Sequence, residues 1–414
     1  MRVLGLYCGH DASACVVEDG KVLIALEEER LTGYKKMDGF PARSLMYICR
    51  FLKCGIDDFD KVMVATPSLV SGRMHAVDSN TVLKLYPDAE LVPHHHAHAV
   101  LAYCWSGFKD CTVMTCDGGG DRSFATIYKC QDGILTRTSE CLKADNEAFG
   151  MLYYYVTEAL GFKPNRHEGK VMGLAAYGND IGIFDGLFWS DGTQIKAKGK
   201  REEVIVFKRL MERQRLAIKR FTSQDIAASC QFEFEFVLLN WIKDNADKDL
   251  PLAVSGGCFA NVLANMKISN IYKHFYVAPA MMDCGLSIGA ALSAFSPLPI
   301  KYQDNVYFGL SQSPRPENMY PPAEVAKMLN EGKIVGLFQG RMEFGPRALG
   351  NRSILADARD SRINESLNRR LRRTEFMPFA PVILKEYADE ILLTLENGLA
   401  NAPFMTNCWQ VRNE

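Results

Sequence analysis

The segment best suited to chemistry is a histidine run. Four of the protein's eight histidines lie within residues 94–98. The preceding Pro93 suits the first turn of a helix, and the apolar run 99–102 lets that helix continue, so His94 and His98 fall four residues apart on one face. Two imidazoles placed this way can bind one cation, which predicts a metal site. The alternative is a surface histidine cluster, because composition alone only suggests metal binding.

Two aspartates are candidates for completing such a site. The strand-like segment 111–116 runs into Asp117 and three glycines, and residues 123–128 resume strand character. We interpret 117–121 as a turn, which places Asp117 at a strand end, where a carboxylate would add oxygen ligands suited to iron, manganese or zinc. Asp283 opens a helix rich in small residues and offers a second carboxylate. The structural alternatives are an ordinary Asp-Gly hairpin turn and a helix N-cap.

Two other segments suggest a bound anion or nucleotide. The strand-like run 252–255 breaks at Gly256 and Gly257 and enters a helix, whose N-terminus offers backbone N–H groups to a phosphate. Tight packing would explain the two glycines equally well. Residues 165–178 place charged groups beside glycines, a mixture that also favours an anion.

Arginines are concentrated late in the chain. Between Arg341 and Arg373 there are nine arginines and four acidic residues. Arginine presents paired donors to phosphate or carboxylate, which predicts a small anionic substrate. Nucleic acid is the competing interpretation, but residues 347–373 contain no stacking aromatics, and a net charge of -1 gives no overall electrostatic footprint for nucleic acid. We therefore expect no nucleic-acid partner.

Composition is that of an average globular protein. The 414 residues allow two or three domains, and 48% of them are hydrophobic. Thirteen cysteines without a CxxC pair, and a beginning without a secretory signal, predict reduced thiols and a cytoplasmic protein. No apolar run reaches the ~18 residues of a membrane span, so we expect no membrane partner.

The helices and strands predicted to position these residues alternate as in α/β proteins. We expect a three-stranded meander at 2–7, 14–18 and 21–27, and the order of strand, glycine-bearing turn and strand recurs at 112–128, which indicates two related halves. The other expected elements are a short strand at 61–65, helices at 42–53, 149–160 and 223–244, and strands at 275–277 and 333–338. Residues 195–220 read as a solvated insertion, and the proline-rich stretch 311–322 as a linker or crossover.

Together these segments resemble a known family, the O-carbamoyltransferases of antibiotic and nodulation-factor biosynthesis, which includes nodulation protein NodU, cephem carbamoyltransferase and tobramycin carbamoyltransferase-like proteins. The similarity covers nearly the whole chain and follows eight motifs in order. They are Gly-His-Asp-Ala-Ser-Ala at 9–14, the histidine run at 94–98, Asp-Gly-Gly-Gly at 117–120, Glu-Gly-Lys-Val-Met-Gly-Leu-Ala at 168–175, Ser-Gly-Gly at 255–257 with Asn261 and Asn265, Asp-Cys-Gly at 283–285, Phe-Gly-Pro-Arg-Ala-Leu-Gly-Asn-Arg-Ser-Ile-Leu at 344–355, and Pro-Phe-Ala-Pro at 378–381.

The resemblance implies both architecture and activity. The architecture is α/β: an actin-like ATPase (ASKHA) fold of two duplicated α/β halves over residues 1–300, a linker or crossover at 301–322, and a partial YrdC-like α/β domain at 323–414. The activity is an ATP-dependent, metal-assisted O-carbamoyltransferase, in which carbamoyl phosphate and ATP give carbamoyl adenylate and a hydroxyl of a small metabolite accepts the carbamoyl group.

The resemblance also implies roles for individual residues. A divalent metal, Fe²⁺ with Zn²⁺ or Mn²⁺ as alternatives, would be held by His94, His98, Asp117 and Asp283. The residues matched to nucleotide binding are Gly118, Gly119, Lys170, Gly173, Gly256, Gly257 and Asn261, and those matched to carbamoyl phosphate are Arg347, Asn351, Arg352 and Ser353. His10, beside Asp11, is our candidate general base for the acceptor hydroxyl, because histidine titrates near neutrality; its alternative role is turn structure.

Two departures from the family pattern qualify this reading. Family members continue past the equivalent of Pro381 through two further motifs, so we expect an incomplete YrdC-like domain, in a shortened chain or one completed by a partner chain. A homo-oligomer is the other expected assembly. Met282 stands where glycine usually precedes the aspartate. The alternative functions are a nucleotide- and metal-binding module or truncated subunit without complete catalysis, and a kinase of the same fold, which would need no pair of metal-binding histidines.

Overall fold

The computed structural model describes residues 1–66, 81–143, 148–198, 221–311, 319–360, 362–371, 379–393 and 402–412. Parts of the predicted insertion at 195–220 and of the predicted linker at 301–322 lie outside the described residues, as do Arg373 and Pro378. No helix in these described ranges combines the length and the apolar character that crossing a bilayer requires.

The first half of the chain begins with a mixed five-stranded sheet in the order β3-β2-β1-β4-β5. Strands β1 (Arg2–Tyr7), β2 (Ser13–Glu18) and β3 (Lys21–Glu27) form an antiparallel meander, and β4 (Lys61–Ala65) and β5 (Glu90–Val92) continue the sheet in parallel. Strands β1 and β2 are buried along almost their whole length, as expected for a sheet covered on both faces. The predicted meander and the strand at 61–65 are confirmed.

A second five-stranded sheet repeats this arrangement in the order β12-β11-β6-β7-β8. Here β6 (Cys111–Gly120), β7 (Ser123–Gln131) and β8 (Ile134–Leu142) form the meander, and β11 (Leu252–Ser255) and β12 (Phe275–Val277) add in parallel. Each strand therefore has a counterpart in the first sheet, beginning with β1 and β6. The predicted pair of related halves is confirmed by this topology.

One local prediction was wrong. Residues 117–121 do not form a turn, because β6 continues to Gly120, which pairs with Ser123. The register shifts between Cys116 and Gly120, as in a β-bulge, and glycines tolerate such an irregular strand because they have no side chain to place. The turn itself falls at Asp121 and Arg122, whose φ angles are 48° and 70°.

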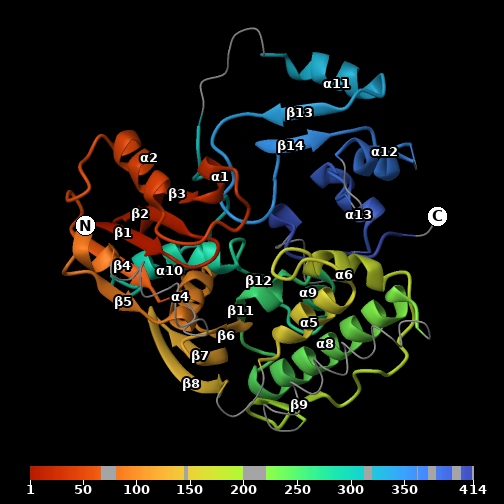
Figure 1. Cartoon of the computed structure of the whole chain (residues 1–414), viewed down its shortest axis with the longest axis horizontal. Helices are drawn as coiled ribbons and strands as arrows, with labels where there is room; N and C mark the ends of the chain where they lie inside the picture. The colour runs from red at the N-terminus through yellow and green to blue at the C-terminus, as the bar shows by residue number, and fades with distance from the viewer. Residues whose placement is uncertain are drawn as a thin grey trace.

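Two buried helices lie between the sheets (Figure 1). Helix α10 (Leu286–Leu292) packs on the first sheet, α4 (His94–Ser106) on the second, and the two helices pack on each other. A Cβ at Gly289 would lie 1.9 Å from the carbonyl oxygen of Ala97, so the helices approach as closely as they do only because small residues line α10. The helix predicted from the histidine run is confirmed, with Pro93 one position before its first residue.

The other elements pack around the sheets and their two central helices or belong to the C-terminal region. They are α1 (Glu29–Thr32), α2 (Ala42–Leu52), α5 (Met151–Ala159), α6 (Glu168–Ala175), β9 (Phe188–Ser190), β10 (Ile195–Ala197), α8 (Ser223–Asn245), η1 (Gly257–Ala260), α9 (Val262–Ser269), η2 (Asp283–Gly285), α11 (Pro322–Asn330), β13 (Val335–Phe338), β14 (Arg352–Leu355), α12 (Ile363–Arg370), η4 (Lys385–Tyr387), α13 (Ala388–Ile391) and η5 (Ala402–Phe404).

The C-terminal region has little core of its own. Strands β13 and β14 form a two-stranded antiparallel sheet, and none of their residues, nor any of α11, is fully buried. The chain then returns to the N-terminal region, where the side chain of Asn265 on α9 donates to the carbonyl of Thr406 at 2.7 Å. The domain boundaries at 300 and 322 stay a prediction, but this terminal segment packs on α9.

Candidate metal centre

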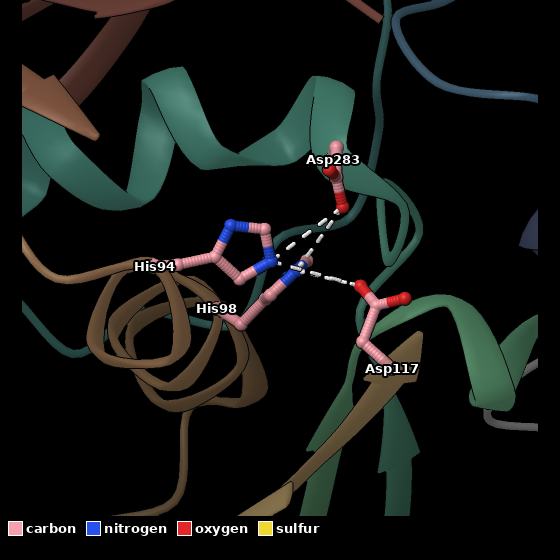
Figure 2. Close-up of side chains that lie close together, drawn as sticks. All are labelled: His94, His98, Asp117 and Asp283. Atoms are coloured by element: carbon pink, nitrogen blue, oxygen red, sulfur yellow. Dashed lines mark ion pairs between the residues drawn. The ribbon is translucent and has the colours of Figure 1, made fainter. Parts of the chain in front are cut away.

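Four side chains from three elements converge between the two sheets (Figure 2). His94 and His98 come from the first turns of α4, Asp117 from β6, and Asp283 from η2 just before α10. One ligand atom from each lies within 4.8 Å of all the others. We call this group the His/Asp cluster; its members are the four residues predicted to bind a metal.

The spacing inside the His/Asp cluster is that of a coordination shell. The Nε2 atom of His98 lies 3.4 Å from Oδ2 of Asp117 and 3.5 Å from Oδ1 of Asp283, and Nε2 of His94 lies 3.7 Å from each of the same oxygens. Four ligands bound about 2.1 Å from a tetrahedral metal ion would be about 3.4 Å apart. The atoms therefore surround a centre of the right size for a cation.

Several of these atoms are buried without a hydrogen-bond partner. Nε2 of His94, Nε2 of His98 and Oδ2 of Asp117 have none, and all three face the centre of the cluster. Leaving a buried polar atom unpaired costs about 1–3 kcal/mol. Three such atoms at one point, on imidazole and carboxylate ligands, fit a site built for a cation.

Surrounding groups orient the ligands. Nδ1 of His98 is bonded to Oγ of Ser255 at 3.1 Å, which leaves Nε2 to face the cluster. The phenol of Tyr7 donates to Oδ2 of Asp283 at 2.6 Å, which leaves Oδ1 to face the cluster. Hydrogen bonds of this kind fix the tautomer and direction of metal ligands.

The imidazoles and carboxylates of the cluster stabilise each other's charged forms. Burial alone would raise the pKa of Asp117, but the facing imidazoles of His94 and His98 hold it well below its usual range. Burial likewise opposes ionisation of Asp283, yet the imidazoles lower its pKa to about 2. Burial would lower the pKa of His98, but both carboxylates raise it to about 9. The site thus pairs two carboxylates with a positive charge, and a metal ion would take the place of the proton on His98.

Glycines provide the space that the cluster needs. A Cβ at Gly120 would lie 2.1 Å from the ring of His94, so a side chain there would displace the imidazole. Gly256 has φ 107°, and a Cβ at Gly257 would lie 3.0 Å from Oδ1 of Asp117. The Gly-Gly turn after β11 therefore packs directly on a cluster aspartate, so close packing explains these glycines and also places their backbone beside the site.

The other two histidines of the run point elsewhere. Nδ1 of His95 is bonded to Oγ1 of Thr115 at 2.7 Å, and the ring of His96 lies 5.9 Å from that of Tyr128. Helical geometry pairs His94 with His98, which are four residues apart, and also leaves His95 near His98, with ring centroids 6.2 Å apart. It is the hydrogen bond to Thr115 that directs Nδ1 of His95 away from the cluster.

The predicted catalytic pair adjoins the cluster. Nδ1 of His10 lies 3.1 Å from Oδ2 of Asp11, and its Nε2 lies 3.5 Å from Oδ2 of Asp283. Burial lowers the pKa of His10, but these carboxylates outweigh it and raise the pKa to about 9. Because the side chain is 46% exposed, solvent weakens the shift, and a cation bound at Asp283 would oppose it further. Lys36, which the sequence did not single out, lies 3.3 Å from the carboxylate of Asp11.

The residues matched to nucleotide binding fall into two groups. Gly118 and Gly119 follow Asp117 in β6, so together with the Gly256-Gly257 turn they lie at the cluster. Lys170 and Gly173 lie on α6, where Nζ of Lys170 is 5.8 Å from the centre of the Phe162 ring. The nucleotide role of both groups stays a prediction.

Asn261 has a clear structural use. Its Oδ1 caps α9 by accepting from the backbone N–H of Ala264 at 3.0 Å, and its Nδ2 donates to Gln231 at 2.9 Å. These contacts hold the helix that follows the Gly-Gly turn. A nucleotide contact by Asn261 also stays a prediction.

The segment matched to carbamoyl phosphate lies against the Gly-Gly turn. In this segment, residues 341–352 and hereafter the arginine loop, Arg347 donates to the carbonyl of Ala260 at the end of η1 at 3.4 Å. Nδ2 of Asn351 donates to the carbonyl of Arg341, and Oγ of Ser353, at the start of β14, accepts from the N–H of Gly350. The structure thus brings the loop to the same edge as the cluster; its substrate role stays a prediction.

Sequence reasoning missed the residues that orient the predicted ligands. Tyr7 ends β1 three positions before His10, and Ser255 ends β11 just before the Gly-Gly turn. Polar residues at the carboxyl ends of strands that point to one site were the available signal. Which of them would reach an aspartate or a histidine depends on how the two halves pack.

Fold and cluster together define an α/β protein of two related halves with a candidate metal centre between them. The family model described as Carbamoyltransferase N-terminus matches residues 69–292, and the one described as Carbamoyltransferase C-terminus matches residues 326–414. The chain therefore belongs to the carbamoyltransferase family and is a carbamoyltransferase enzyme, which confirms the resemblance seen in the sequence.

Individual relatives agree with this assignment. The uncharacterized protein MJ1051 of Methanocaldococcus jannaschii is 30% identical over 447 aligned residues, covering 99% of this chain and 83% of its own length. The nodulation protein NolNO of Sinorhizobium fredii is also 30% identical, over 97% of this chain and 66% of its own length.

Similarity to solved structures is more distant. Component A of the (R)-2-hydroxyglutaryl-CoA dehydratase of Acidaminococcus fermentans covers 71% of this chain, and this chain covers 97% of it, at 15% identity and a TM-score of 0.46. Similarity at this level supports no functional assignment.

Loss of the Tyr7 hydroxyl is expected to weaken metal binding while the fold is kept. Tyr7→Phe removes the hydrogen bond that orients Asp283 but retains the ring that packs edge-on against His94. Loss of one such orienting contact typically lowers metal affinity about tenfold. Competition with a chelator measures the change, with Tyr34→Phe as the control because Tyr34 is 72% exposed. Equal affinities in the two variants would contradict an orienting role for Tyr7.

Proposed function

We propose that this carbamoyltransferase moves a carbamoyl group from carbamoyl phosphate, by way of carbamoyl adenylate formed with ATP, to a hydroxyl of a small metabolite. The observation that carries the proposal is the convergence of His94, His98, Asp117 and Asp283 beside the Gly-Gly turn. The repeated order of the two sheets is what an actin-like ATPase fold of two duplicated halves would have, and that fold supports the use of ATP.

In this proposal the His/Asp cluster holds a divalent ion, Fe²⁺ or else Zn²⁺ or Mn²⁺, since mixed imidazole and carboxylate ligands accept all three. The ion would supply positive charge to the phosphate groups of the nucleotide. The backbone at Gly256 and Gly257 would add N–H donors to the same phosphates. Arg347 would pair with the phosphate of the carbamoyl donor.

Transfer to the acceptor would then use the loop between β1 and β2, which carries His10 and Asp11. The hydroxyl oxygen of the acceptor forms a bond to the carbamoyl carbon, the bond from that carbon to the phosphate oxygen of AMP breaks, and the hydroxyl proton passes to His10. Asp11 would orient the imidazole through the contact at Nδ1. General-base help of this kind typically contributes about 10²- to 10⁴-fold to a rate.

A direct assay tests the proposal. The purified protein is incubated with carbamoyl phosphate, ATP and a panel of hydroxylated metabolites, with iron, zinc or manganese supplied in turn. We expect release of pyrophosphate that requires carbamoyl phosphate, and a carbamoylated product with the right acceptor. The proposal fails if neither appears with any of the metals.

A second candidate is a nucleotide- and metal-binding module that needs a partner chain for catalysis. The observation that favours it is the lack of fully buried residues in α11, β13 and β14, because a two-stranded sheet without cover is marginal by itself. On this view the C-terminal region, residues 323–414, is a partial YrdC-like domain that a second polypeptide or a second copy completes. ATP binding without turnover, with activity restored by the added polypeptide, would favour this candidate.

A further inference from the structure

The two arginines matched to the carbamoyl donor have unequal surroundings. Among the described residues Arg347 has no ion-pair partner. Its guanidinium donates to the carbonyl of Ala260 at 3.4 Å, and its Nε is buried without a hydrogen-bond partner. Burial with no compensating charge lowers the pKa of Arg347. Arg352 instead donates to the carbonyls of Gly345 at 2.9 Å and Arg347 at 3.0 Å. Arg352 is therefore held by the loop through Nη2 and faces the carboxylate of Glu343 with Nε, whereas Arg347 faces no carboxylate among the described residues.

A buried carboxylate organises this loop from the inside. Glu343 is 2% exposed, and its Oε1 accepts from the backbone N–H groups of Leu349 at 2.6 Å and Asn351 at 2.7 Å. Its Oε2 accepts no hydrogen bond and lies 3.4 Å from Nε of Arg352. One side chain thus joins the beginning of the arginine loop to its end.

The loop is also fixed to the first half of the protein. The N–H of Gly345 donates to Oε1 of Glu27 at 2.7 Å, and Arg30 joins the other oxygen of Glu27 at 2.6 Å and the carbonyl of Gly345 at 3.3 Å. Gly345 has φ 111°, where a side chain would be strained. Glu27 therefore fixes the position of the arginine loop on the first half of the protein, and Glu343 fixes the conformation within the loop.

We propose that Glu343 is a positioning residue that, with Arg352, shapes the arginine loop so that Arg347 alone presents its guanidinium to the phosphate of an anionic donor. This inference rests on the proposed function for the identity of the anion. It differs from the expectation that Arg347 and Arg352 bind the donor together, because it gives Arg352 a bracing role. A carboxylate suits the task, since it accepts from two N–H groups at one oxygen and attracts a guanidinium at the other.

The test measures the structure of the loop by hydrogen exchange and the use of the donor by steady-state kinetics. In Glu343→Gln the amide can keep accepting at one oxygen, but its NH₂ group turns toward Arg352 and repels it. We expect the amides of Leu349 and Asn351 to exchange hydrogen about tenfold faster than in the unchanged protein, and the KM for carbamoyl phosphate to rise about tenfold with a smaller change in kcat. Glu331→Gln is the matched control, because Glu331 pairs with Lys333 on the surface.

Arg352→Lys tests the bracing role of Arg352 independently and keeps the positive charge at this position. Lysine cannot reach both carbonyls and Glu343 at once, so the same faster exchange is expected. Arg347→Lys should raise KM and leave the two amides protected. Unchanged exchange in both Glu343→Gln and Arg352→Lys would overturn the bracing role, whatever the enzyme turns over. Faster exchange without any change in KM would show that the brace exists but that the loop does not bind the donor, which would count against the proposed function.

Discussion

Replacement of His98 by alanine is expected to abolish tight metal binding and carbamoyl transfer together. His98 is fully buried, and its Nε2 lies closer to both aspartates than Nε2 of His94 does. Loss of a residue that merely orients a ligand costs about 10- to 100-fold in metal affinity, so loss of the ligand itself should cost more than about 100-fold. Elemental analysis of the purified variant measures the metal, and the pyrophosphate assay measures the activity.

The histidine run provides its own control for this experiment. His96→Ala removes an imidazole from the same helix, but the His96 ring lies beside Tyr128 and not in the cluster. This variant should keep its metal and its activity, with only a small change in thermal unfolding. A full complement of metal in His98→Ala, or equal losses in the two variants, would show that the cluster is not the metal site.

The four cluster residues were predictable because each stands at a place that local rules define. His94 and His98 follow from the 3.6-residue period of a helix. Asp117 was predictable because it directly follows the strand-like segment 111–116. The turn at 117–121 was nevertheless wrong, because glycine favours turns and irregular strands alike. Only the pairing of Gly120 with Ser123, set by the whole hairpin, distinguishes the two.

The contacts that orient the ligands were not predictable from local patterns. Tyr7 and Asp283 are 276 residues apart, and Ser255 and His98 are 157 apart. Their meeting depends on how β1, α4 and α10 pack between two sheets, which no sequence window contains. Glu343 was missed for a related reason, since an acid in a segment with nine arginines is interpreted as a charge partner and not as an acceptor for backbone N–H groups.

Replacement of Arg347 by alanine is expected to impair use of the carbamoyl donor while metal binding is kept. Arg347 has no carboxylate partner among the described residues, so its removal leaves no buried acid unpaired, and the fold should survive. A charge-assisted contact to a phosphate is worth about 1.5–3 kcal/mol, which predicts a loss of about 10- to 150-fold in kcat/KM for carbamoyl phosphate. Steady-state kinetics with varied donor, at saturating ATP, measures this loss.

Two comparisons make the Arg347 result specific. Arg359→Ala removes an arginine of the same region that pairs with Asp357 on the surface, and it should change kcat/KM by less than twofold. Metal content should equal that of the unchanged protein in both variants, because Arg347 contacts η1 and not the His/Asp cluster. An Arg347→Ala variant with unchanged kcat/KM for the donor would place the anion elsewhere on the molecule. Loss of metal in that variant would mean that the arginine loop supports the cluster itself.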